Sequence, residues 1–351
     1  GRVDENDLFQ KGGLQEKIGH CLHRAAFQAE SQEEFRERMG KAIEAYEDAR
    51  AHYGKSQSNE KSALINRCGA MTKYLAYWVE RRPAEKLRLL DECLELEAKA
   101  LTEFWNVGNK LEYGRTYNLF PLVFQVFKPP GEWSEVKKVL KRVLDDGIEW
   151  GEKAVAALSE LGRSEELARA YVVLANCLQE LSGGFVEETP PETMQYLKKA
   201  FDLAEASADA HLLGLLYYWR GRLDDRGSQD AFVHFRKTLL YGDEARDNFL
   251  RTVGVDGLVF HTVLKASLIE DPDERAKLME QAKELYDREE RLYSITSSIP
   301  LFSGVFWPPW GLVDYHYYQG LYETDPDKRR DFFNKSIEAG TKALEPGVLY
   351  E

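Results

Sequence analysis

The chain has 351 residues, of which 43% are apolar and 30% are charged, so it is long and apolar enough to bury a core. Its formal net charge of −13 argues against nucleic acid and anionic membranes as main partners, because both are bound by basic surfaces. No cysteine pair has metal-site or redox spacing, so we expect no cofactor and a reducing, cytoplasmic compartment. The sequence begins with Gly, and we expect it to be a piece of a larger protein with no membrane span.

Helical periodicity runs along the whole chain, and strand signals are scarce. Short stretches with Pro, Gly, Asp or Ser divide the helical segments into pairs. We expect seven pairs, at 14–30 with 33–53, 61–81 with 84–105, 111–126 with 133–161, 164–182 with 191–208, 210–224 with 229–249, 255–270 with 273–297, and 311–323 with 326–345. Capping residues mark several helix starts. Ser31 is one, and Asp271 and Asp325, both followed directly by Pro, are two more.

The segment 85–104 illustrates the expected amphipathic character. Its apolar positions lie three or four residues apart and form one stripe: Leu87, Leu90, Leu94, Ala98 and Leu101. The opposite face carries charged residues and is expected to be solvated: Glu92, Glu95, Glu97 and Lys99. Such a helix covers a core on one side only.

Helix pairs that cannot bury their apolar stripes alone are typical of an α-solenoid, in which each pair packs on the next. An irregular helical bundle is the alternative. We expect a single domain over 1–351, with a capping pair at 1–60, a repeat array at 61–345 and a tail at 346–351.

Several first helices contain a small residue followed three positions later by an aromatic one: Gly114 with Tyr117, Ala168 with Tyr171, Gly214 with Tyr217, and Gly257 with Phe260. This pattern resembles the core motif of the tetratricopeptide repeat, although the spacing of 43 to 54 residues between successive sites exceeds the 34 of that repeat. The small residue lets two helices approach closely. The resemblance implies an all-α, right-handed superhelix whose first helices line a concave face that binds a peptide, a protein or, less often, a small ligand.

Carrying that geometry over places five residues on the concave face: Arg115, Asn118, Arg169, Tyr218 and His261. The two arginines could bind an acidic ligand group through their planar fork of donors. They could equally pair with glutamates of the chain itself.

The sequence also contains an apolar, proline-rich segment twice. Residues 121–130 read PLVFQVFKPP and residues 300–309 read PLFSGVFWPP, with six matches at a fixed offset. One reading is that each segment fills a packing gap or forms a patch for a partner chain; another is that the two form an aromatic-walled pocket. The walls of that pocket would be Phe127, Trp133, Phe306, Trp307 and Trp310.

Three functions remain open. We expect a non-catalytic binding or scaffold module of a regulatory protein, with a peptide or protein partner. The alternatives are a sensor of a small apolar or aromatic molecule bound between 121–133 and 300–310, and an enzyme of the α-α toroid type. The sequence lacks a phosphate loop and a nucleophile elbow. His20 and His23 have no third ligand at a suitable spacing, so no metal site is expected.

Overall fold

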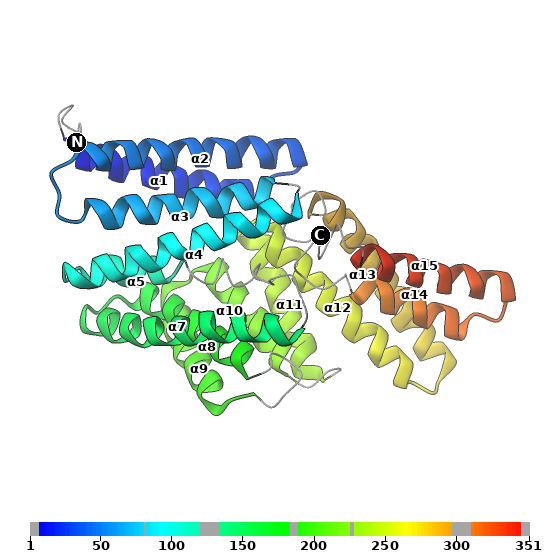
Figure 1. The fold of residues 1–351 in the computed structure, drawn as a ribbon. Helices are drawn as coiled ribbons and strands as arrows, with labels where there is room; N and C mark the ends of the chain where they lie inside the picture. Colours follow the sequence, from blue (N-terminus) through cyan, green and yellow to red (C-terminus); the bar gives the residue numbers. More distant parts are fainter. Residues whose placement is uncertain are drawn as a thin grey trace. The chain divides into compact units, whose positions relative to one another are not determined.

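The computed structural model describes residues 7–80, 82–119, 133–182, 189–224, 228–296 and 310–344. These residues form helices and no strands, and the helices lie one after another along the chain (Figure 1). The chain folds as two compact units, unit 1 over Gly1–Ser207 and unit 2 over Ala208–Glu351. The single domain over 1–351 stays a prediction.

Unit 1 contains four helix pairs in its described part. The first members are α1 (Leu8–Ala26), α3 (Lys61–Val79), α5 (Lys110–Tyr117) and α8 (Ser164–Leu181). The second members are α2 (Gln32–Lys55), α4 (Pro83–Asn106), α7 (Trp133–Glu160) and α9 (Pro191–Ser207). Each helix packs on the helix that follows it, and α5 also contacts α8, the first helix of the next pair. Figure 1 shows α1 to α5 running side by side.

The residues of unit 2 that the structure describes form three pairs. They are α10 (Ala210–Leu223) with α11 (Gln229–Glu244), α12 (Asn248–Leu268) with α13 (Pro272–Thr296), and α14 (Trp310–Tyr322) with α15 (Pro326–Leu344). The first helices stack, since α10 contacts α12 and α12 contacts α14. The all-α, tetratricopeptide-like fold class is therefore confirmed from the chain's own helix pairing.

Capping bonds explain most helix starts. The Ser31 hydroxyl accepts from the Glu34 amide at 3.1 Å, and an oxygen of Asp271 accepts from the Glu274 amide at 3.1 Å. The helix predicted at 229–249 instead ends at Glu244, because Arg246 has a φ of 51° and Asp247 caps a new helix through the Leu250 amide at 3.1 Å. The prediction merged the end of α11 with the start of α12.

The small residues of the repeat-like motif lie where helices touch. A Cβ built on Gly114 of α5 would lie 2.6 Å from Leu158 Cγ of α7, and one on Gly257 of α12 would lie 2.3 Å from Phe235 Cδ1 of α11. The aromatic residue three positions after Gly114 is Tyr117, which is fully buried. The motif therefore marks close helix packing, as the sequence predicts.

Candidate functional site

A chain of alternating acidic and basic side chains, with a tyrosine at one end, crosses unit 1 and joins α1, α2, α3, α5 and α8. We call it the polar ladder, and it consists of Tyr53 of α2, Glu16 of α1, Arg67 of α3, Glu112 and Arg115 of α5, and Glu166 of α8. Glu16 accepts from Tyr53 Oη at 2.9 Å, and both of its oxygens face Arg67, at 2.7 Å from Nε and 2.9 Å from Nη2. The other Arg67 Nη atom pairs with Glu112.

The inner end of the polar ladder is buried. The side chain of Arg67 is 8% exposed, and its guanidinium carbon lies 5.2 Å from the centre of the Phe104 ring of α4. Burial alone would lower the pKa of Arg67, but the negative charges of Glu16 and Glu112 outweigh it and raise that pKa well above its ordinary value. Removing one partner of such a group leaves a buried charge without compensation, so Arg67 holds α1, α3 and α5 together.

The outer end of the polar ladder reaches solvent. Arg115 is 44% exposed at its side chain, donates to Glu112 at 2.8 Å, and makes longer bonds of 3.2 and 3.3 Å to one oxygen of Glu166. Asn118, one turn later, donates to the Glu166 carbonyl at 2.9 Å. The structure therefore brings the predicted residues Arg115 and Asn118 together against α8.

The third predicted residue of unit 1, Arg169, lies on α8 and faces Glu165 of its own helix at 3.6 Å. Partial desolvation lowers the pKa of His20 of α1, and the positive charges of Arg24 and Arg169 lower it further. The charge of Arg169 therefore acts on His20 of α1, and Arg169 lies about one turn after Glu166 on α8.

The predicted residues of unit 2 are buried side chains. Tyr218 of α10 accepts from Arg222 Nη1 at 3.0 Å, and its ring meets Phe249 edge-on at 5.9 Å. His261 of α12 packs against the ring of Phe235 at 5.4 Å. Both therefore contribute packing within unit 2.

The predicted proline-rich pocket falls largely on residues outside the described part of the chain. Phe127, Phe306 and Trp307 lie outside the described residues, as do both copies of the duplicated segment. Trp133 and Trp310 are the first residues of α7 and α14. The aromatic pocket stays a prediction.

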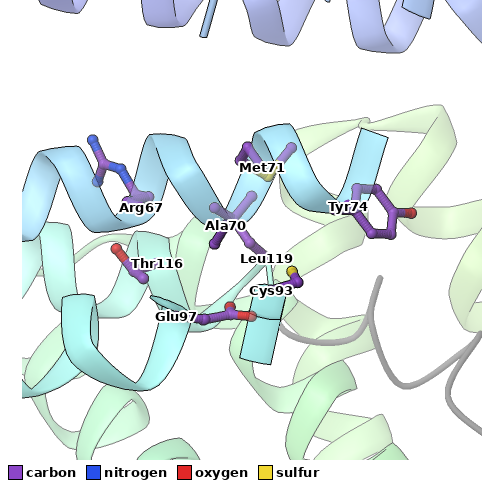
Figure 2. Close-up of a pocket in the computed structure, with 8 residues that line it drawn as sticks. All are labelled: Arg67, Ala70, Met71, Tyr74, Cys93, Glu97, Thr116 and Leu119. Carbon is purple, nitrogen blue, oxygen red and sulfur yellow. The ribbon is translucent and has the colours of Figure 1, made fainter. Parts of the chain in front are cut away.

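A small cavity that no sequence pattern predicts lies beneath α3, next to the polar ladder (Figure 2). Arg67 lines one side, and Glu97 of α4 and Thr116 of α5 supply further polar groups. Glu97 is only 2% exposed, so its predicted place on a solvated helix face is wrong. The reason is that α4 packs on both α3 and α5, which makes its buried sector wider than a one-sided stripe.

Metal and membrane sites have no counterpart among the described residues. In the part of the chain that the structure describes, no three His, Cys, Asp or Glu side chains gather as metal ligands. Nor do the helices described include one long and apolar enough to span a bilayer. His23 is buried among the rings of Phe27 and Tyr74.

No protein-family model and no curated protein sequence matches the chain. Among solved structures, the apo form of RapI is similar over 94% of this chain and 98% of that one, at 15% identity and a TM-score of 0.46. A circular tandem repeat protein with novel repeat topology matches over 98% and 87%, at 15% identity and a TM-score of 0.28. A chain from the computational design of self-assembling cyclic homooligomers matches over 97% and 95%, at 10% identity and a TM-score of 0.19. Likenesses of this size carry no argument about function.

Proposed function

We propose that the chain is a non-catalytic binding module, and that a peptide or protein segment carrying carboxylates binds at the outer end of the polar ladder. The observation that carries the proposal is the exposed guanidinium of Arg115, which donates two long hydrogen bonds to the same oxygen of Glu166. A guanidinium binds a carboxylate best when two N–H groups meet two oxygens. An incoming carboxylate can offer that geometry to Arg115.

The energetic contrast along the polar ladder supports this division of roles. Exposed ion pairs contribute about 0–1 kcal/mol, so exchanging Glu166 for a ligand carboxylate costs little. Arg67 is buried between two carboxylates, and opening its pairs would leave uncompensated charges. The inner end therefore holds the helices, while the outer end is free to exchange partners.

Arg169 extends the proposed site along α8. It is partly exposed, and its guanidinium lies 3.6 Å from Glu165. Two arginines on neighbouring first helices would give a partner two points of attachment. The free thiols of the four cysteines, three of them buried, fit the cytoplasmic setting that we propose for this function.

Selection from a displayed library of random peptides tests the proposal. The selected peptides should be enriched in Asp and Glu, and Arg115→Gln combined with Arg169→Gln should weaken their binding at least about tenfold, or 1.4 kcal/mol. Arg88→Gln is the matched control, because Arg88 is an exposed arginine that pairs with a glutamate three residues before it, as Arg115 does.

Melting temperatures of the variants should match that of the unmodified chain. Peptides without carboxylates, or an equal loss of affinity with Arg88→Gln, would contradict the proposal.

A further inference from the structure

The cavity between α3, α4 and α5 has room for one water molecule. Its volume is about 10 Å³, close to the minimum that a single water needs. Apolar side chains form much of its wall: Ala70, Met71, Cys93 and Leu119. An apolar cavity of this size would stay empty, so its polar groups decide whether water enters.

Besides Arg67 Nε, which lies 2.7 Å from Glu16, two polar atoms of residues that line the cavity have no hydrogen-bond partner among the described residues. One is Glu97 Oε1 of α4, on a residue 2% exposed, and the other is Thr116 Oγ1 of α5, on a residue with no exposure. In Figure 2 both side chains reach into the space beneath α3. A water between them would satisfy a carboxyl and a hydroxyl that otherwise remain buried without bonds.

Among the described residues, Glu97 has no cation to stabilise its charge. Arg67 of α3 is engaged by the carboxylates of the polar ladder. The other ionisable groups that face the carboxyl are Tyr74 of α3, Cys93 of α4 and Tyr117 of α5, and burial raises the pKa of each so that they remain neutral. Burial likewise raises the pKa of Glu97 well above its ordinary value. This direction favours the protonated carboxyl, which can donate a hydrogen bond as well as accept one.

We propose that Glu97, Thr116 and one enclosed water form a proton-dependent latch that holds α4 against α5. The latch is closed while the carboxyl keeps its proton, because only then can Glu97 lie in a cavity without a cation. Loss of the proton requires hydration of the carboxylate, which means that α4 and α5 must separate locally.

The latch is linked to the polar ladder through shared elements. Arg67 lines the cavity, and Glu112 precedes Thr116 by about one turn of the same helix. Opening the latch therefore loosens α5, the helix that also carries Arg115. A rise in pH is expected to increase the local opening of this part of unit 1.

Hydrogen exchange of the full chain, followed by mass spectrometry between pH 6 and 9, tests the latch. Opening that releases one proton makes the open population rise up to about tenfold per pH unit, after correction for intrinsic exchange. We expect this slope in segments 93–106 and 110–119. Glu97→Gln should abolish the slope, and Thr116→Val should raise opening at every pH while keeping the slope.

The matched controls are Thr72→Val and Glu289→Gln. Thr72 is a buried threonine of α3 whose hydroxyl already donates to the Cys68 carbonyl, so its loss should leave both segments unchanged. Glu289 is a buried glutamate of unit 2, so its substitution should leave the slope in unit 1 unchanged. A flat pH profile in the unmodified chain, or an unchanged slope in Glu97→Gln, would overturn the proposal.

Two measurements on the unmodified chain keep the test independent of variant folding. A carbon-13 titration should show the Glu97 carboxyl ionising well above its ordinary pKa; ionisation at that ordinary value overturns the latch. A nuclear Overhauser effect from a long-lived water to the Thr116 methyl is expected at pH 6. Its absence would overturn the proposal that an enclosed water joins Glu97 to Thr116.

Discussion

Gly114 offers a direct test of how the helices of unit 1 pack. A methyl group added at this position would lie 2.6 Å from Cγ and 2.7 Å from both Cδ atoms of Leu158, which is fully buried. Gly40, inside α2, has no atom within 4 Å of the same added methyl. The pair Gly114→Ala and Gly40→Ala therefore separates packing from helix propensity.

Replacing Gly by Ala inside a helix stabilises it by about 1 kcal/mol, and this gain is common to both variants. Only Gly114→Ala also overpacks a core, at a cost of about 1–3 kcal/mol. The two variants should thus differ by that cost. For a unit of 207 residues, a difference of this size corresponds to about 2–12 °C in melting temperature.

Calorimetry of the full chain measures this difference, with hydrogen exchange identifying the transition of unit 1. Gly40→Ala should melt above the unmodified chain, and Gly114→Ala should melt clearly below Gly40→Ala. In a Leu158→Ala background, Gly114→Ala should become stabilising because the clash is gone. If both alanine variants gain equally in the unmodified background, then Gly114 is not a close-packing position.

Three more changes have defined outcomes. Arg67→Met should destabilise unit 1 by about 3–5 kcal/mol in chemical denaturation, and adding Glu16→Gln with Glu112→Gln should restore most of that loss; no recovery would contradict the ion-pair account. Burial lowers the pKa of His23 from 6.5 to about 3, so folding stability should fall as pH drops below 6.5. In His23→Phe, the melting temperature should depend less on pH in this range. Burial raises the pKa of Glu289, so stability of unit 2 should decline as pH rises above 4.5, and a Glu289→Gln variant that keeps the decline would refute this assignment.

The positions of the helix pairs could be predicted from sequence because their signals are local. Asp271 and Asp325 cap the helices that follow them through bonds that span two or three residues. Gly114 and Tyr117 likewise lie one turn apart on one helix. The boundary at 245–247 could not be predicted, because the turn between α11 and α12 depends on one left-handed residue, Arg246, with no Gly or Pro beside it.

The polar ladder could not be predicted, because its bonds join residues far apart in the chain. Arg67 lies 51 residues after Glu16 and 45 residues before Glu112. For a related reason, the periodicity of the helix predicts the solvated face for Glu97. Its burial depends on α5 packing beside α4, and periodicity within one helix carries no information on a second neighbour.

The sharing of Arg67 between two carboxylates has a consequence for how the sequence can vary. In a relative that lost Glu16 or Glu112 alone, the buried charge of Arg67 would lack one of its two carboxylate partners. In a relative that lost Arg67 alone, both carboxylates would lack their cation. Replacement of all three by apolar residues leaves no buried charge and therefore preserves stability. Positions 16, 67 and 112 should therefore change together among homologues, as one inherited set, whereas folding places no such joint constraint on the pair of Arg115 and Glu166.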